Sequence, residues 1–256
     1  MRKLTVGSCF SGIGGLELGL EWTGGFETKW QIEIDPYATK VLEKHWPKVR
    51  RYGDIATVGG GELERVDLIC GGYPCQPFSI AGRRRGQADS RHLWPEMFRL
   101  IRDLRPRFAL LENVPNHLRL GFDQVLGDLA EIGFDAEWDC IPAAVVGADH
   151  LRDRIFVLAY PPSERGGIFR CVETSSDHPF GPLQNQWGEK RNPRNCTLVG
   201  LRMDSLRRAA ESGVLPMAHG IPNRSHRLRC IGNSVVPQVA QAIGEMILAY
   251  EGAPHE

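Results

Sequence analysis

Residues 3–22 read KLTVGSCFSGIGGLELGLEW, in which an apolar run is followed by a glycine-rich turn and a helix-like segment. The glycines of FSGIGG, at residues 10–15, let the backbone pass close beneath a ligand where the helix starts. A nicotinamide or flavin cofactor is disfavoured, because Glu17 occupies the position where the dinucleotide fingerprint needs its third glycine. The opening therefore predicts a strand, a ligand-binding turn and a helix.

The same alternation of apolar runs and amphipathic stretches continues to residue 160. TKWQIEI precedes PYATKVLEKHW, VDLICGG precedes LWPEMFRLIRDL, and RFALLEN precedes FDQVLGDLAEI. FDAEWDCI and RIFVLAY then follow with no helix-like segment between them, as in an antiparallel hairpin. This order predicts an α/β fold, a doubly wound and mostly parallel sheet with an antiparallel strand at one end. Ligands of such sheets bind at the carboxyl ends of the strands.

The remainder of the chain divides into a loop-rich segment and a helix. Residues 161–232 hold eleven Lys and Arg against six Asp and Glu, which suits either a polyanion or a solvated surface. Apolar residues recur at helical spacing after Asn233, and IGNSVVP at residues 231–237 is expected to begin that helix. We expect a large domain over residues 1–160, completed by a C-terminal helix at 231–256, and a small basic region at 161–230.

Composition limits the classes of protein to consider. The 256 residues carry 31 basic and 31 acidic side chains, and the seven cysteines are never spaced as CxxC. We therefore expect neither a disulfide framework nor a metal site. We expect a reducing, cytoplasmic setting. No apolar stretch approaches the roughly eighteen residues of a membrane span, so we expect no membrane partner and no secretion.

One cysteine stands between two prolines in GGYPCQPFS, at residues 71–79. Each proline fixes its own φ and biases the preceding residue away from the helical region, so Cys75 is expected on a stiff loop at a strand end. A buried structural thiol is the commoner state of a cysteine, but the prolines and polar neighbours favour a reactive one. Attack by a thiol needs a lowered pKa or a nearby proton acceptor.

Three further groups of polar side chains lie at or near strand ends, and adjacent strand ends could bring one of them, Glu112, into one cleft with Cys75. Glu112 ends the next strand, where a buried carboxyl of raised pKa can donate a proton to a ring nitrogen; a helix cap or an ion pair is the alternative. Glu33 ends the second strand, where it can accept both hydroxyls of a ribose unless it is simply solvated. Arg152 and Arg154 alternate along a strand, so period two puts both on one face, to bind oxygens or to form surface salt bridges.

Taken in order, these motifs resemble the C5-cytosine-specific DNA methyltransferase family, in a short form of bacterial or phage type. The segments that carry the resemblance are FSGIGG (10–15), EIDPYA (33–38), GDI (53–55), GGYPCQPFS (71–79), DSRHLWPEM (89–97), LLENV (110–114), RDRIFVLA (152–159) and IGNSVVPQVA (231–240). The family has a Rossmann-like catalytic domain and uses S-adenosylmethionine, which becomes S-adenosylhomocysteine.

The resemblance implies a role for each matching residue. Cys75 would attack C6 of a cytosine flipped out of DNA, Glu112 would contact N3 and the exocyclic amine, and Arg154 with Arg152 would support O2. The cofactor would lie among Phe10, Ser11, Gly12, Ile13, Gly14, Gly15, Glu33, Ile34, Asp54, Ile55, Pro74, Asn233, Ser234 and Val235. The contacts to DNA would come from Ser79, Arg83, Arg84, Arg85, Arg227 and Arg229.

Two departures from the family pattern leave recognition open. His150 stands where the arginine motif usually has glutamine, and only about seventy residues separate RIFVLAY from IGNS. Such a short segment favours a target in double-stranded DNA that is brief, relaxed or completed by a specificity partner. The protein would work alone or beside a cognate restriction endonuclease. The alternatives are an RNA (tRNA) cytosine-5 methyltransferase and a catalytically silent cofactor-binding or DNA-binding module; a Rossmann dehydrogenase fits least.

Overall fold

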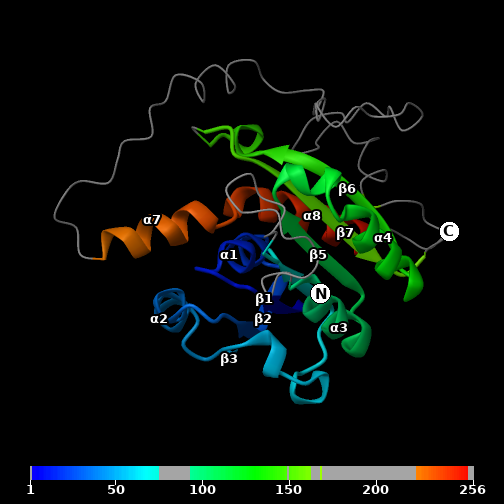
Figure 1. Ribbon diagram of the computed structural model, residues 1–256, viewed down its shortest axis with the longest axis horizontal. Coiled ribbons are helices and arrows are strands. Elements are labelled where there is room, and N and C mark those ends of the chain that lie inside the picture. The colour runs from blue at the N-terminus through cyan, green and yellow to red at the C-terminus, as the bar shows by residue number, and fades with distance from the viewer. Residues whose placement is uncertain (1, 75–92, 149, 163–167, 169–222, 253–256) are drawn as a thin grey trace.

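The computed structural model describes residues 2–74, 93–148, 150–162, 168 and 223–252 of the chain. A seven-stranded sheet with strand order β3-β2-β1-β4-β5-β7-β6 runs through its centre (Figure 1). The strands are β1 (Leu4–Cys9), β2 (Phe26–Ile32), β3 (Arg50–Tyr52), β4 (Leu68–Gly71), β5 (Phe108–Asn113), β6 (Asp135–Pro142) and β7 (Asp153–Tyr160). The pairs among β1 to β5 are parallel, and β7 is antiparallel to both β5 and β6. The predicted α/β class, with an antiparallel element at one end, is confirmed.

Helices cover both faces of the sheet. They are α1 (Gly15–Trp22), α2 (Pro36–His45), α3 (Trp94–Leu104), α4 (Phe122–Glu131), α7 (Arg224–Asn233) and α8 (Pro237–Gly252). Short 3-10 turns lie at Ile55–Thr57, Gly60–Glu62, Pro115–Arg119 and Ala143–Val146. None of the helices in the described ranges is both long and apolar enough to cross a bilayer.

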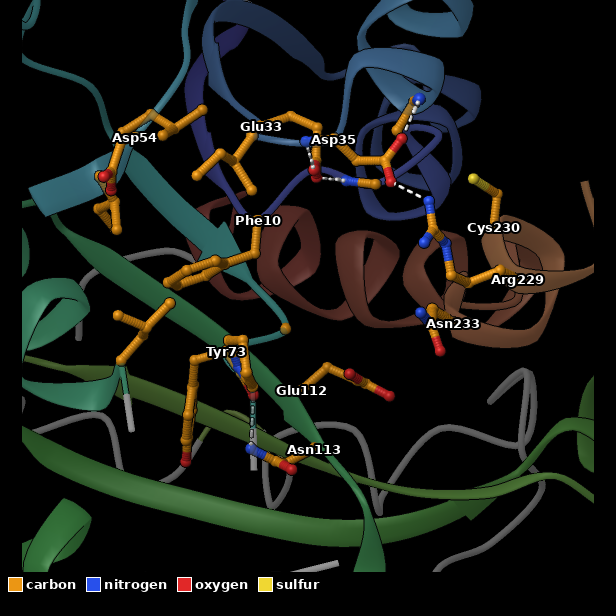
Figure 2. Close-up of a pocket in the computed structure, with 18 of the residues that line it drawn as sticks. Phe10, Glu33, Asp35, Asp54, Tyr73, Glu112, Asn113, Arg229, Cys230 and Asn233 are labelled. Atoms are coloured by element: carbon orange, nitrogen blue, oxygen red, sulfur yellow. Dashed lines mark hydrogen bonds and ion pairs between the residues drawn. The ribbon is translucent and has the colours of Figure 1, made fainter. Parts of the chain in front are cut away.

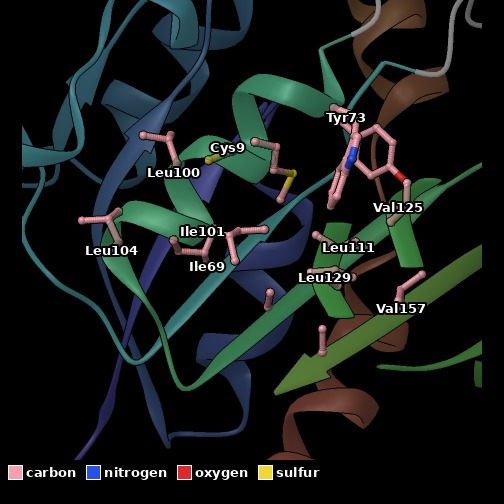
Figure 3. Packing of buried hydrophobic residues seen from close by; sticks show 14 of the residues in the cluster. Cys9, Ile69, Tyr73, Leu100, Ile101, Leu104, Leu111, Val125, Leu129 and Val157 are labelled. Atoms are coloured by element: carbon pink, nitrogen blue, oxygen red, sulfur yellow. The ribbon is translucent and has the colours of Figure 1, made fainter. Parts of the chain in front are cut away.

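The period-two alternation of the strands divides the core into two layers. On β4, Leu68 packs with α1 and α8 on one face of the sheet, whereas Ile69 packs with α3 and α4 on the other. On β5, Leu110 and Leu111 divide between the two layers in the same way. Figure 3 shows the second layer, where Leu100 and Leu129 approach the sheet. Strands covered on both faces read as continuous apolar runs, as VDLICGG and RFALLEN do.

The prediction that IGNSVVP begins the last helix is wrong. Asn233 ends α7, the backbone is extended at Ser234, and α8 begins at Pro237. Proline suits a first helical position, because its fixed φ matches the helix and its missing N–H would be unpaired there, and it biases the residue before it toward extended backbone. Helix α7 also crosses the expected domain boundary between residues 230 and 231.

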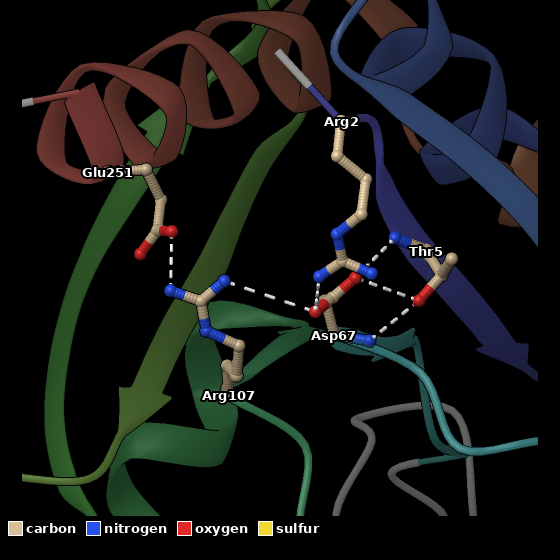
Figure 4. Close-up of polar contacts among 5 residues, drawn as sticks. All are labelled: Arg2, Thr5, Asp67, Arg107 and Glu251. Atoms are coloured by element: carbon tan, nitrogen blue, oxygen red, sulfur yellow. Dashed lines mark hydrogen bonds and ion pairs between the residues drawn. The ribbon is translucent and has the colours of Figure 1, made fainter.

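A polar network fixes the edge of the sheet where β4 begins (Figure 4). Asp67 accepts hydrogen bonds from the Thr5 backbone at 2.8 Å, the Thr5 hydroxyl at 2.9 Å and an Arg2 guanidinium nitrogen at 2.8 Å. Arg107 lies 3.9 Å from the same carboxylate and also pairs with Glu251 on α8. Burial acts to raise the pKa of Asp67, but the contacts from Thr5 and Arg2 hold it below its usual value. This network joins the amino-terminal ends of β1, β4 and β5 to the carboxyl-terminal end of α8.

Candidate active site

A cavity of about 480 Å³ opens at the carboxyl ends of β1, β2, β4 and β5 (Figure 2). Each of these strands delivers a side chain to it: Phe10 follows β1, Glu33 follows β2, Pro74 follows β4, and Glu112 lies in β5. This is the edge at which ligands bind in parallel α/β sheets. The volume lies in the range of about 300–1,000 Å³ that is typical of small-molecule sites.

The turn after β1 holds a backbone conformation that favours glycine. Phe10 has φ 55° and Gly12 has φ 56°, and such conformations in non-glycine residues concentrate at functional sites. Gly12 lines the cavity, and a Cβ built there would meet nothing within 4 Å. The turn therefore leaves open space above it for a ligand.

Glu33 is oriented by two backbone donors. Gly12 N–H donates to Oε2 at 2.6 Å and Asp35 N–H donates to Oε1 at 2.8 Å. Each carboxylate oxygen has a second lone pair, so Glu33 can still accept hydrogen bonds from two hydroxyl groups. Its neighbour Ile34 is 70% exposed and also lines the cavity, beside the buried Ile55. The cavity thus combines a fixed carboxylate with apolar walls.

The residues expected at a cofactor form two groups. Phe10, Gly12, Glu33, Ile34, Asp54, Ile55, Pro74 and Asn233 line the cavity, whereas Ser11, Ile13, Gly14, Gly15, Ser234 and Val235 are not among its lining residues. A Cβ on Gly15 would lie 2.5 Å from the Val235 carbonyl oxygen and 2.7 Å from the Ser234 hydroxyl oxygen. Gly15, Ser234 and Val235 therefore pack against one another behind the cavity.

The buried Glu112 forms an ion pair with the half-buried Arg154 at the cavity wall. Arg154 Nε lies 2.9 Å from Glu112 Oε1, and Glu112 is only 8% exposed. Burial raises the pKa of Glu112 to about 6, although Arg154 and Arg152 both act to lower it. A Cβ on Gly72 would lie 2.6 Å from the other carboxylate oxygen, so the absence of a side chain there makes room for the acid. Glu112 can therefore hold or release a proton near neutral pH.

Arg152 does not follow the period-two expectation. Strand β7 begins at Asp153, and Arg152 precedes it with φ 28°. Its guanidinium donates to the Ser234 carbonyl oxygen at 2.7 Å and is not part of the cavity lining. Arg152 connects the start of β7 to the segment between α7 and α8. It acts on Glu112 through its charge, which lowers the pKa of that carboxyl.

The two arginines of α7 that were expected at DNA occupy different surroundings. Arg227 is exposed. Arg229 pairs with Asp35 and lines the cavity (Figure 2). One turn earlier, His226 stacks on Tyr37 with 5.5 Å between ring centroids. These contacts hold α7 against the start of α2, at the rim of the cavity.

Several predicted residues lie outside the described residues, namely Cys75, Ser79, Arg83, Arg84 and Arg85. Among the residues that the structure does describe, no three His, Cys, Asp or Glu side chains gather as a metal site. The prediction also omitted Tyr73, Asn113 and Arg229 as cavity residues. Tyr73 directly follows Gly72, and Asn113 directly follows Glu112, so their place beside the motifs was the available signal. Nothing in the sequence indicated that Arg229 lines the cavity.

Comparison with known proteins gives a consistent result. A family model described as C-5 cytosine-specific DNA methylase matches residues 4–192. The chain is 34% identical over 197 residues to the Type II methyltransferase M.NgoMIV of Neisseria gonorrhoeae, an alignment that covers 72% of this chain and 62% of that protein. It is 38% identical over 165 residues to the Type II methyltransferase M2.BsuMI of Bacillus subtilis, covering 61% of this chain and 42% of that protein.

Solved structures share the fold at low sequence identity. The Entamoeba histolytica methyltransferase EhMeth superposes with a TM-score of 0.67 at 15% identity, covering 99% of this chain and 100% of that one. The S. pombe Dnmt2 methyltransferase gives a TM-score of 0.66 at 15% identity, covering 97% and 99%. By sequence, the chain spans less than two thirds of the length of the two Type II methyltransferases described above.

Proposed function

The chain belongs to the C-5 cytosine-specific DNA methylase family, and from this premise we propose that it transfers a methyl group from S-adenosylmethionine to C5 of cytosine in double-stranded DNA. The observation that carries the proposal is the ion pair between the buried Glu112 and Arg154, in the cavity that Gly72 and Pro74 also line. Pro74 directly precedes Cys75 in the sequence. A carboxyl with a pKa of about 6 suits proton donation to a ring nitrogen at neutral pH.

The cavity residues fit S-adenosylmethionine. Glu33 offers oriented carboxylate oxygens to the ribose hydroxyls, and the exposed Ile34 with Ile55 offers apolar surface to the adenine ring. Asp54 also lines the cavity, and Gly12 leaves space above the turn. When bound, the cofactor supplies an electrophilic methyl group on a sulfonium centre.

The protein side chains would make C5 of cytosine nucleophilic. The Cys75 thiolate would add to C6 while Glu112 gives its proton to N3, which turns the ring into an enamine that attacks the methyl group through C5. Arg154 would hold the ionised Glu112 and the base O2. Loss of the C5 proton to a base, expulsion of Cys75 from C6 and return of the N3 proton to Glu112 then restore the aromatic ring.

Duplex DNA buries both faces of cytosine, so this reaction requires the base to leave the stack. The family description names DNA, and the named relatives are Type II methyltransferases, which supports DNA over RNA as the substrate and a role in restriction-modification. We propose action in the cytoplasm, where thiols stay reduced, with recognition residing in the small basic region at residues 161–230.

Covalent trapping tests the proposal. A duplex containing 5-fluorocytosine cannot lose its C5 substituent as a proton, so the Cys75 adduct should persist when S-adenosylmethionine is present and should migrate as a protein–DNA complex under denaturing conditions. Cys75→Ala should give no complex, whereas Cys140→Ala, which removes a buried thiol on β6 outside the cavity, should still give one. Trapping on a tRNA that contains 5-fluorocytosine, but not on the duplex DNA, would support the RNA alternative. No trapping on either nucleic acid would contradict covalent catalysis.

A further inference from the structure

Tyr73 is buried two residues before Cys75, and its hydroxyl is bonded to an equally buried histidine. The Tyr73 hydroxyl lies 2.7 Å from Nε2 of His117, and the two side chains are 4% and 2% exposed. Nδ1 of His117 lies 3.0 Å from the Leu120 carbonyl oxygen. Tyr73 belongs to an apolar cluster (Figure 3) and also lines the cavity, so its bond to His117 places polar atoms in mostly apolar surroundings.

The partners of His117 determine its tautomer. A carbonyl oxygen can only accept, so Nδ1 must carry the proton in the bond to Leu120. In the neutral ring that carries its proton on Nδ1, Nε2 is an acceptor, so the Tyr73 hydroxyl donates to it. The two hydrogen bonds run from the Tyr73 hydroxyl to Nε2 of His117 and from Nδ1–H of His117 to the Leu120 carbonyl oxygen. Together they fix the orientation of both rings.

The same tyrosine is bound through its backbone. Parallel pairing of β4 and β5 ends at Gly71 and Leu111, and beyond it Asn113 Nδ2 donates to the Tyr73 carbonyl oxygen at 3.0 Å (Figure 2). The Asn113 Oδ1 atom accepts from Val114 N–H at 2.8 Å, which fixes the orientation of the amide. The Asn113 side chain therefore connects the end of β5, which carries Glu112, to the segment after β4, which carries Pro74, beyond the last backbone pair of the two strands.

Aromatic packing completes the surroundings of Tyr73. Its ring lies 5.1 Å from the Trp94 ring and 5.5 Å from the His117 ring, measured between centroids. Trp94 begins α3, and its indole N–H donates to Asp128 Oδ2 of α4 at 2.6 Å. Tyr73 is thus held from α3, from β5 and from the turn after β5.

We propose that His117 is a positioning residue for the methyl transfer proposed above, on which this inference rests: through the Tyr73 hydroxyl it fixes the Gly72–Pro74 turn relative to Glu112. A phenylalanine at 73 would fill the same space without burying a hydroxyl, so the hydrogen bond serves orientation more than volume. Orientation matters because displacement of a reacting group by about 1 Å can lower a rate about a hundredfold.

The test deletes the hydroxyl alone. Tyr73→Phe should keep the ring packing, lower kcat for methyl transfer to duplex DNA about tenfold, and leave the dissociation constant for S-adenosylmethionine within about twofold. The matched control is Tyr160→Phe, which removes a buried hydroxyl that contacts Glu137 and Ile168 at the opposite edge of the same sheet. That variant should lose a similar amount of thermal stability and keep its kcat.

Substitutions at the acceptor provide the second arm. His117→Gln can still accept from Tyr73 and donate to Leu120, so it should recover most of the kcat that His117→Leu loses, and the loss in His117→Leu should not add to that in Tyr73→Phe. Nitrogen chemical shifts of His117 should report a neutral ring protonated on Nδ1. An active wild type with unchanged kcat in Tyr73→Phe, or a His117 ring protonated on Nε2 alone, overturns the inference, whereas an inactive wild type overturns the proposed function and the inference together.

Discussion

Arg154 and Glu112 face each other across the antiparallel pair β7 and β5, with Arg154 Nε 2.9 Å from Glu112 Oε1. Phe156 is the direct partner of Glu112 in the ladder, and Arg154 lies two residues before it, so both side chains project from one face of the sheet. The antiparallel strand that ends the parallel series therefore supplies the cation for an acid carried by a parallel strand.

Replacement of Glu112 by glutamine should change how the unfolding free energy depends on pH. The pKa of Glu112 is raised from 4.5 to about 6, so between these values the folded protein binds more protons than the unfolded chain, and its stability falls as pH rises. Relative to Glu112→Gln, the wild type should lose about 2 kcal/mol of unfolding free energy between pH 4 and pH 7, at ~1.4 kcal/mol per unit of pKa shift. Denaturant unfolding at both pH values measures this.

The same variant should be nearly inactive. An amide cannot give its proton to N3, so kcat of Glu112→Gln should fall by about a hundredfold or more. Equal slopes of stability against pH in the two proteins would contradict the raised pKa, and retention of kcat would contradict the role of the acid.

The ion pair of Arg229 with Asp35 should contribute to cofactor affinity. Asp35 N–H donates to Glu33, and its side chain caps α2 by accepting from Tyr37 and Ala38 N–H at 2.8 and 3.1 Å. Asp35→Ser keeps a capping oxygen but loses the charge, so it should weaken S-adenosylmethionine binding about two- to fivefold, as Arg229→Gln should. The two effects should not add in the double variant.

Isothermal titration measures these affinities, with Arg227→Gln as the control. Arg227 lies two residues from Arg229 on the same helix and is exposed, so its loss removes an equal charge away from the cavity. This variant should bind S-adenosylmethionine normally and show a weaker dependence of DNA affinity on salt. Additive losses in Asp35→Ser and Arg229→Gln would argue against a shared pathway to Glu33.

Asp67 should be important for stability but not for chemistry. Asp67→Asn weakens three contacts, from Thr5 N–H, the Thr5 hydroxyl and Arg2, and should cost about 1–3 kcal/mol of unfolding free energy at neutral pH. Because the folded pKa of Asp67 is depressed, the difference from wild type should shrink as pH falls through that pKa. Thermal unfolding at pH 7 and at low pH checks this, and kcat should be unchanged.

Alanine substitutions at Gly72 and Gly127 should have different effects, the first on kcat and the second on stability. A Cβ at Gly72 would lie 2.6 Å from Glu112 Oε2, so Gly72→Ala should displace the acid and lower kcat at least tenfold. Gly127 lies within α4, and a Cβ there meets nothing within 4 Å, so Gly127→Ala should raise stability by about 0.5–1 kcal/mol without changing kcat. Similar behaviour of the two variants would contradict the crowding at Glu112.

The sequence pattern was sufficient for six of the seven strands and for α1 to α4, because apolar runs in the strands and period 3.6 in the helices directly reflect burial. The three-residue strand β3, Arg50–Tyr52, has no apolar run and was not predicted. Helix α7 could not be predicted in this way. Its described side chains are mostly exposed, and its position depends on contacts with α2 that are remote in sequence, from Arg229 to Asp35 and from His226 to Tyr37.

Burial of Glu17 was also beyond the sequence pattern. Glu17 is a charged residue of α1, yet it is fully buried, and it accepts a hydrogen bond from Gln31 Nε2 at 3.3 Å. Burial raises the pKa of Glu17 above its usual value. The motifs did indicate that Glu33 and Glu112 approach one cavity, because strand ends of a parallel sheet meet at one edge, but the Tyr73–His117 bond and the Arg152–Ser234 bond depend on packing.

Mass spectrometry of nucleosides tests the central claim most directly. Duplex DNA incubated with the full chain and S-adenosylmethionine, then digested to nucleosides, should contain 5-methyl-2′-deoxycytidine. DNA incubated with Cys75→Ala should contain none above background, and DNA incubated with Glu112→Gln should form it far more slowly. Absence of that nucleoside with the wild-type chain, or its continued formation by Cys75→Ala, would contradict methyl transfer through a Cys75 adduct.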